Sequence, residues 1–302
     1  VHGALLLLSL ATLPVIASPA AQGSGFENPT WNVLIVLAAT VGMPYLLLST
    51  TGPLMQAWYA RSFNSLMPYR LYALSNLASM VALLSYPVLV EPYFPVRNQG
   101  LIWSVGYALF VVACLGSAWQ SWQGVASERE RTASPPESTP RPPWRECLLW
   151  VGLAMTASIL LLAITRHLTQ DVAPVPFLWV LPLSIYLLSF ILCFDAPRYY
   201  YRPGFLCALP VAFVALDQVV DNRGMSVPAL VALLSVSLFV FCMVCHGELV
   251  RRRPPVRHLT LFYLMLSIGG ALGGSFVGLL APALFNAYFE LPIGLFLCGA
   301  LV

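Results

Sequence analysis

The segment STTGPLMQAWYARSFNSLMPYRLYALSNLASMVALLSYPVLVEP, residues 49–92, joins two apolar runs through a short turn that carries arginines. Glycine followed by proline at 52–53 predicts a break in the first helix, because proline lacks the N–H that an α-helix needs. Pro87 and the pair Glu91-Pro92 predict the end of the second helix. Two apolar helices of this length in succession indicate an all-α, polytopic membrane protein.

The composition of the whole chain indicates the same class. Hydrophobic residues make up 59% of the 302 residues and charged residues only 9%, whereas soluble proteins average roughly 25% charged residues. The mean hydropathy is +0.80. All 15 basic residues are arginines, and a net charge of +3 is too small to indicate a nucleic-acid partner. The seven cysteines lie in or at the ends of apolar runs, which favours buried thiols over a disulfide framework.

About ten apolar runs have the length or position of membrane-spanning helices. The first, at residues 4–17, follows no basic leader, which favours a truncated spanning helix over a signal peptide. The last run begins at 291 and is still apolar at Val302, so we expect the chain to be cut at both ends. The runs between them cover residues 31–51, 69–90, 100–122, 147–168, 174–194, 203–220, 226–246 and 259–285.

Arginines are distributed unevenly between the loops that join these runs. Twelve of the 15 lie in alternate loops, at 61–70, 129–145, 198–202 and 251–257. The opposite loops hold only Arg97, Arg166 and Arg223. Under the positive-inside rule the arginine-rich loops are cytoplasmic, and ten spans place both ends of this chain in the cytoplasm too.

Residues 124–146, GVASERERTASPPESTPRPPWRE, form the one long polar segment. Alternating glutamate and arginine, followed by serine, threonine and proline, cannot bury enough apolar surface to fold, which predicts a disordered cytoplasmic linker. The linker divides the chain into an N-terminal membrane half at 1–123, with four spans, and a C-terminal half at 147–302, with six. A transporter of two six-helix halves would need two more helices upstream.

Two segments align as an internal repeat: RLYALSNLASMVALLSYPVLVEP at 70–92 and LFYLMLSIGGALGGSFVGLLAPALF at 261–285. Tyr72 matches Tyr263, and Asn76 matches Ser267. The offset of about 191 residues spans six runs, so both copies would have one orientation in the membrane. Parallel repeats of this kind relate the two halves of major-facilitator transporters, although apolar helices rich in small residues also look alike by chance.

Five motifs carry a resemblance to a known family: STTGPLMQAWYARS, PYRLYALSNLASMVALLSYPVLVEP, DVAPVPFLWVLPLSIYLLSFILCF, CHGELVRRRP and HLTLFYLMLSIGGALGGSF. Together they closely resemble the membrane portion of fused major-facilitator/spermidine-synthase-like bacterial proteins, over residues 28–282. The resemblance implies a multi-pass protein of the bacterial cytoplasmic (inner) membrane. It also implies further helices beyond both ends of this chain and a missing C-terminal, Rossmann-like domain similar to polyamine synthases.

Polar residues within or beside the spans are the candidate site residues. Tyr72, Gln56 and Asn76 either line a substrate path or connect helices by hydrogen bonds, and the second reading is favoured. His167 is suited to proton coupling by its ordinary pKa range or is a surface residue at a helix end. Asp171 before Ala173-Pro174 resembles a helix N-cap.

Arginines beside the membrane form a second group of candidates. They either gate transport through ion pairs at the cytoplasmic face or, as is favoured, set the topology and contact lipid headgroups. The residues in this group are Arg61, Arg70, Arg251, Arg252 and Arg253.

Two motifs resemble soluble binding sites but have a simpler interpretation. Cys242, Cys245 and His246 have metal-ligand character, but one helix rarely supplies a whole tetrahedral site, so we expect no metal. His246 and Glu248 are instead candidates for an intracellular gate or polar cluster. The glycines at 269–274 lie inside an apolar run and not after a strand, which favours close helix packing over a dinucleotide loop.

Two function classes follow from these patterns. In the first, the chain is a transporter-like domain that moves a small solute, such as a polyamine or a relative, by rocking two halves about a midplane site. In the second, it is a membrane anchor or scaffold for the missing aminopropyltransferase-like domain. Carboxylates lie almost wholly at helix ends, which weakens a polycation carrier and leaves a neutral, anionic or lipid-like solute. We expect no catalytic site and no cofactor in this chain; its partners would be the lipid bilayer, a solute and its own C-terminal domain.

Overall fold

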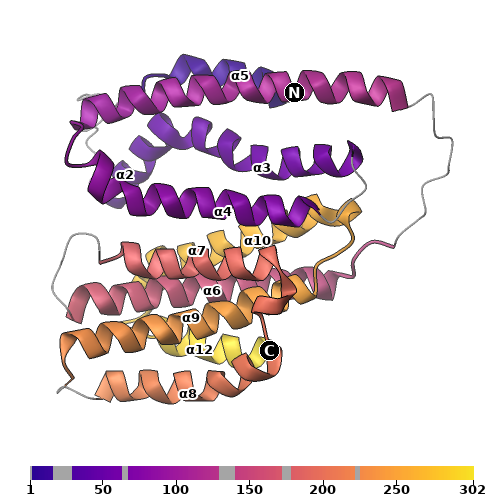
Figure 1. Ribbon diagram of the computed structural model, residues 1–302. Helices are drawn as coiled ribbons and strands as arrows, with labels where there is room; N and C mark the ends of the chain where they lie inside the picture. The colour runs from indigo at the N-terminus through magenta and orange to yellow at the C-terminus, as the bar shows by residue number, and fades with distance from the viewer. Residues whose placement is uncertain (1, 16–28, 63–66, 129–139, 172–177, 222–224) are drawn as a thin grey trace. The chain divides into compact units, whose positions relative to one another are not determined.

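The computed structural model describes residues 2–15, 29–62, 67–128, 140–171, 178–221 and 225–302 (Figure 1). Within these ranges the secondary structure is helical and contains no strand. Contacts divide the chain into two compact units. Unit 1 comprises residues 1–65 and 86–138, and unit 2 comprises residues 66–85 and 139–302.

Unit 1 is built around one small apolar core. The helices of this unit are α1 (His2–Ser9), η1 (Leu10–Thr12), α2 (Pro29–Leu37), η3 (Ala38–Gly42), α3 (Met43–Ser62), η4 (Tyr86–Val90) and α5 (Val96–Glu128). The core consists of Leu6, Leu47, Tyr107, Val111 and Cys114. Many other large apolar side chains of this unit are exposed, as in a helix surface that faces lipid.

The predicted helix break at Gly52-Pro53 is wrong, because Pro53 lies inside α3. Proline removes one backbone donor, which leaves the Ser49 carbonyl four residues earlier without its helical partner, but membrane helices tolerate this loss. Likewise Pro87 does not end its helix, since the chain continues from α4 through the π-helical turn η4 to Val90.

Unit 2 contains the larger part of the buried core. Its helices are α4 (Met67–Ser85), α6 (Trp144–Asp171), α7 (Val180–Asp195), η5 (Pro197–Tyr199), α8 (Arg202–Asp221), α9 (Val227–Arg251), η6 (Val256–His258), α10 (Leu259–Ser275), η7 (Phe276–Leu280), α11 (Ala281–Leu284) and α12 (Glu290–Leu301). Helix α6 packs against α7, α9, α10 and α12, while α9 also packs against α7 and α8, and α4 packs against α7. The helices α6 and α9 are therefore the centre of this unit.

The glycines of α10 fix its close approach to α6. A Cβ atom added at Gly269 would lie 2.4 Å from the Val151 carbonyl oxygen, and one at Gly273 would lie 2.6 Å from the carbonyl oxygen of Met155. Neither contact leaves room for a methyl group, so both positions require glycine while α10 keeps this distance from α6. This geometry agrees with the packing role predicted for the glycines at 269–274.

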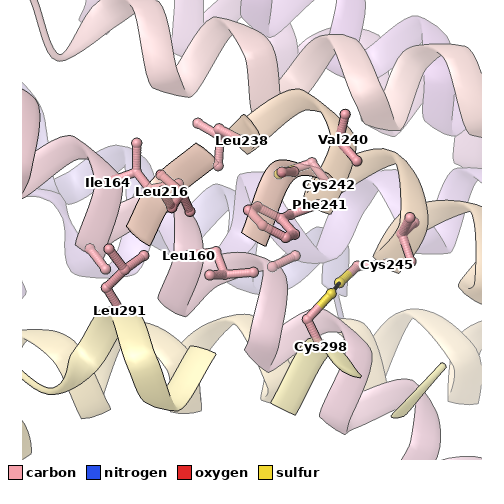
Figure 2. Close-up of a cluster of buried hydrophobic side chains, with 14 of the residues drawn as sticks. Leu160, Ile164, Leu216, Leu238, Val240, Phe241, Cys242, Cys245, Leu291 and Cys298 are labelled. Carbon is pink, nitrogen blue, oxygen red and sulfur yellow. Dashed lines mark hydrogen bonds between the residues drawn. The ribbon is translucent and has the colours of Figure 1, made fainter. Parts of the chain in front are cut away.

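Helix α12 is joined to the centre of the unit by small and apolar side chains (Figure 2). Leu291 and Cys298 of α12 pack with Leu160 of α6 and Phe241 of α9. The sulfur atoms of Cys245 and Cys298 lie 4.0 Å apart, and both thiols are free and buried. Buried thiols were the prediction, and six of the seven cysteines are at least partly buried; Cys207 is exposed.

Six helices are long and apolar enough to cross a membrane: Trp31–Gln56, Tyr69–Val90, Val96–Gln120, Trp144–Thr169, Val227–Arg251 and Leu259–Leu284. They support the all-α, membrane-protein class. The other four predicted runs coincide with shorter apolar helices, His2–Thr12, Val180–Asp195, Arg202–Leu216 and Glu290–Leu301. The predicted count of ten spans thus rests on four helices that are shorter than a full crossing.

The predicted domain boundaries differ from the two units in two places. Residues 124–128 and 144–146 were expected in the linker but belong to α5 and α6, and residues 129–139 lie outside the described part of the chain. Helix α4 was expected in the N-terminal half at 1–123 but belongs to unit 2. The physical reason is aromatic packing, because the Tyr72 ring of α4 contacts the rings of Phe190, Phe194 and Tyr263.

Candidate functional site

Polar contacts gather the arginine-rich segments at one end of unit 2. Arg70 at the start of α4 pairs with Asp195 at the end of α7, at 3.4 Å. The Tyr69 hydroxyl donates to the Pro254 carbonyl at 2.6 Å, and the Trp150 indole donates to the Arg252 carbonyl at 3.1 Å. Within unit 2, the predicted cytoplasmic segments therefore meet at one end.

Glu248 is the buried centre of this end. Its carboxylate accepts hydrogen bonds from Arg202 at 2.7 Å, Arg251 at 3.1 Å and the Tyr200 hydroxyl at 3.1 Å. Arg252 lies 3.9 Å from the second carboxylate oxygen. Burial and the Glu248 carboxylate both raise the pKa of Tyr200, which keeps its hydroxyl protonated as a donor. One carboxylate is thus satisfied by three guanidinium groups and a phenol, as a buried charge requires.

A cavity of about 220 Å³ lies beside the Glu248 cluster. Arg251 and Arg253 line it together with Tyr200 and Gly247. A Cβ atom on Gly247 would lie 2.4 Å from the Tyr200 ring, so glycine at this position lets the ring pack directly on α9. Arg253 lies over the Tyr69 ring, with 4.9 Å between its guanidinium carbon and the ring centroid.

His246 is fully buried two residues before Glu248, but it faces α7. Its Nδ1 lies 2.8 Å from the Ser189 hydroxyl, and that hydroxyl donates to the Tyr186 carbonyl at 2.7 Å. A hydroxyl has one hydrogen, so both contacts are satisfied only when His246 donates from Nδ1. This assigns the neutral tautomer in which Nε2 is an acceptor. In the part of the chain that the structure describes, that Nε2 has no hydrogen-bond partner.

Two aromatic rings of α7 contact His246, and rings of α4 and α10 extend this packing. The imidazole stacks on Phe190 with 3.7 Å between ring centroids, and the Tyr186 ring meets it edge-on at 4.9 Å. Phe190 in turn contacts Tyr72 at 5.7 Å, and Tyr72 contacts Tyr263 at 4.7 Å. We call these side chains, with Phe194, the aromatic cluster. It connects α4, α7, α9 and α10.

The aromatic cluster contains a second polar atom without a partner. The Tyr263 hydroxyl is buried, and among the described residues nothing hydrogen-bonds to it. Buried polar atoms are normally satisfied, and an exception in a membrane-spanning segment indicates a place for a ligand or water.

The opposite end of unit 2 holds the other predicted charged residues. Arg166 pairs with Glu290 at 2.9 Å, and its guanidinium carbon lies 4.0 Å from the centroid of the Tyr288 ring. His167 lines an apolar cavity of about 630 Å³ between α6, α8 and α12. Asp171 is the last residue of α6, and residues 172–177, which include the predicted helix start at Ala173-Pro174, lie outside the described part of the chain. The side chain of Asp171 lies outside the described part.

The other predicted site residues, Asn76, Gln56 and Arg61, are shown making no hydrogen bond to a side chain of the aromatic cluster within the described part of the chain. Asn76 donates its amide to the Tyr72 carbonyl of its own helix, at 2.9 Å. Gln56 is buried in unit 1, and its Oε1 has no partner among the described residues. The two amides belong to different units. The side chain of Arg61 lies outside the described part.

Cys242, Cys245 and His246 face different neighbours. Cys245 lies against Cys298 of α12, whereas His246 contacts Ser189 of α7. Within the described residues no group of three or more His, Cys, Asp or Glu side chains is placed to hold a metal ion. The geometry of this motif is therefore that of separate packing contacts.

Several site residues were not predicted from the sequence. Tyr186, Ser189 and Phe190 lie in an apolar run of the usual kind, and only their packing on α9 reveals them. Tyr200 and Arg202 could have been noticed as a tyrosine and an arginine at the start of an apolar helix. The sequence does not show their shared partner Glu248, which is 48 residues from Tyr200 and 46 from Arg202. Comparison with protein-family models, curated proteins and solved structures finds no match to this chain.

Proposed function

We propose that this chain is a transporter-like membrane domain, and that the aromatic cluster forms part of the path of a small solute. One observation carries the proposal: the buried Nε2 of His246, inside a candidate span, is an acceptor without a partner among the described residues. An unsatisfied acceptor at this depth is costly unless a ligand or water donates to it. His246 is five residues from the end of α9, about 8 Å along the axis, which places it near the arginine-rich end of the path.

The chemistry of the cluster favours a neutral solute that donates hydrogen bonds. Nε2 of His246 accepts, and the Tyr263 hydroxyl both donates and accepts. The aromatic cluster contains no carboxylate, and Glu248 beside it is already bonded to Arg202 and Arg251. A polyamine requires carboxylates or several aligned acceptors to replace its hydration, so a polycation fits this cluster poorly.

Parallels between α4 and α10 support the proposal of a major-facilitator-like repeat. The matched residues Tyr72 and Tyr263 contact each other, with ring centroids 4.7 Å apart. Asn76 donates to the Tyr72 carbonyl, and its counterpart Ser267 donates to the Tyr263 carbonyl, each four residues back. Both helices also continue into a five-residue π-helical turn, Tyr86–Val90 and Phe276–Leu280. The offset between these turns agrees with that of the sequence repeat.

The orientation in the membrane follows from the same proposal. The arginine-rich end of unit 2, at the end of α9, would face the cytoplasm by the positive-inside rule. With the four shorter helices counted as spans, the chain crosses a bacterial inner membrane ten times. The alternative role, an anchor for a cytoplasmic aminopropyltransferase-like domain, predicts no uptake by the membrane domain.

The test is an uptake assay with the purified chain in proteoliposomes. A panel of radiolabelled neutral, anionic and cationic solutes is offered, with protein-free liposomes as the blank. We expect uptake of a neutral solute above the blank, and we expect Tyr263→Phe to reduce it about tenfold, as the loss of one hydrogen bond to the solute predicts. Because the Tyr263 hydroxyl has no protein partner, the variant should unfold at the wild-type temperature.

Tyr69→Phe is the matched control. The Tyr69 hydroxyl donates to the Pro254 carbonyl, so its removal should lower stability by about 1 kcal/mol. It should leave uptake unchanged, because the variant keeps the ring that packs on Tyr263 and loses only the hydroxyl that is bonded to Pro254. Equal uptake by the wild type and by protein-free liposomes across the panel would contradict the proposal and favour the anchor.

A further inference from the structure

The arginine-rich end of unit 2 carries more positive charge than its own carboxylates neutralise. Three arginines share Glu248 within 4.0 Å. Glu146 contributes only a contact of 3.9 Å to Arg252, with both side chains partly exposed. The excess is concentrated where the 220 Å³ cavity lies, since its lining includes two arginines and no carboxylate.

Arg253 is an arginine of this end that pairs with none of the described carboxylates. Within the described residues no carboxylate lies within ion-pair distance of it. Its guanidinium is instead held over the Tyr69 ring, and the Tyr69 hydroxyl is fixed by the Pro254 carbonyl. A ring orients a guanidinium without neutralising it, so the N–H donors at the rim remain available to an anion.

Arg251 lines the same cavity. Its Nη1 is bonded to Glu248, which leaves other guanidinium donors free to point away from the carboxylate. Its side chain is about half exposed. Two guanidinium groups, one anchored on a carboxylate and one on an aromatic ring, thus border a cavity large enough for a phosphate group and several waters.

We infer that this cavity is a phosphate-binding site, with Arg251 and Arg253 as the ligands of a phosphate monoester or diester anion. Guanidinium groups bind phosphate oxygens through paired, charge-assisted hydrogen bonds. Two sources supply this chemistry at a membrane surface: the headgroup of an anionic lipid and a soluble phosphate ester. The site is separate from the aromatic cluster, so the inference does not depend on the proposed solute.

The test compares two phosphate probes on the full chain in neutral detergent micelles. The unfolding temperature is measured against inorganic phosphate, and against dihexanoyl phosphatidylglycerol, at constant ionic strength with chloride as the balancing anion. Binding to the folded state raises this temperature as the probe concentration passes Kd. We expect saturable stabilisation by at least one probe.

Arg253→Gln should weaken the affinity for that probe about tenfold, and Arg253→Lys should restore part of it. Arg253 is preferred to Arg251 for this test, because its removal leaves no carboxylate unpaired. Arg198→Gln is the matched control: Arg198 is exposed, contacts Tyr199 and does not line the cavity. It should bind the probe with wild-type affinity.

The outcomes distinguish the sources and can overturn the site. Saturation by phosphatidylglycerol alone assigns a lipid headgroup, whereas saturation by inorganic phosphate assigns a soluble phosphate ester. If neither probe saturates, or if Arg198→Gln weakens binding as much as Arg253→Gln does, the cavity is not a site and the arginines act as a diffuse surface charge.

Discussion

His246 and Glu248 lie two residues apart on α9, and both are buried, with 0% and 2% of their surfaces exposed. They differ in how many hydrogen-bond partners their polar atoms have. Glu248 accepts hydrogen bonds from Tyr200, Arg202 and Arg251. His246 has one partner for two ring nitrogens. The contrast teaches that burial of an ionisable group does not identify a binding site. What identifies it is an acceptor that the protein leaves without a donor.

The geometry of the helix explains why neighbours can differ this much. Successive residues of an α-helix are rotated by about 100°, so positions two apart face nearly opposite directions. His246 therefore faces Ser189 and the rings of α7, while Glu248 faces the start of α8. Gly247 between them admits the Tyr200 ring, and this ring supplies one of the donors to Glu248.

The largest expected effect is the loss of stability on removing the Glu248 carboxylate. Glu248→Leu would leave three arginines and Tyr200 without their common acceptor, and we expect the free energy of unfolding to fall by about 3 kcal/mol. The measurement is a denaturant titration of the purified protein in mixed micelles.

Glu146→Leu is the matched control for this change. Glu146 also faces Arg252, but at 3.9 Å and with 39% of its side chain exposed, so its removal should change stability by less than about 1 kcal/mol. Similar losses for the two variants would show that Glu248 is no more than a surface partner, and the contrast with His246 would disappear.

A smaller effect is expected where α10 brings Tyr263 into the aromatic cluster. Gly269→Ala adds a methyl group 2.4 Å from the Val151 carbonyl oxygen, and overpacking of this kind costs about 2 kcal/mol. Gly274→Ala, five residues later on the same helix, meets nothing within 4 Å and should be neutral or slightly stabilising. The unfolding temperatures of the two variants test the α6–α10 contact. Equal temperatures would mean that the helices pack differently.

The smallest effect is expected at Asn76. Its amide donates to the Tyr72 carbonyl within one helix, so Asn76→Leu should lower the free energy of unfolding by only about 0.6 kcal/mol, the average for polar contacts in membrane proteins. Uptake should be unaffected, because the Asn76 amide is bonded to the Tyr72 carbonyl and not to Nε2 of His246. Loss of uptake at unchanged stability would instead place Asn76 in the path.

The sequence predicted the parts of this protein that depend on local pattern. Apolar runs located the helices, and glycines 269–274 predicted a close helix contact because such spacing has few other uses inside a span. The charge pattern predicted that Arg70 and Arg252 lie on the cytoplasmic side, which stays a prediction; within unit 2 these arginines contact Asp195 and Glu146.

What the sequence could not supply was the pairing of distant side chains. The helix break predicted at Gly52-Pro53 is wrong because propensity weighs the missing N–H of Pro53 but not the rest of α3, which continues from Met43 to Ser62. Ser189 fixes the tautomer of His246 from 57 residues away. Such contacts depend on which helix faces meet, and in apolar helices with little amphipathicity no periodic pattern marks those faces.

The most direct test of the central claim is His246→Leu, with uptake in proteoliposomes and the free energy of unfolding measured on the same preparation. Ser189 keeps its bond to the Tyr186 carbonyl in this variant, so stability should change by less than about 1 kcal/mol. Uptake should fall at least about tenfold, because the solute loses its acceptor. Wild-type uptake together with a loss of stability above about 2 kcal/mol would contradict the account and make His246 a structural residue like Glu248.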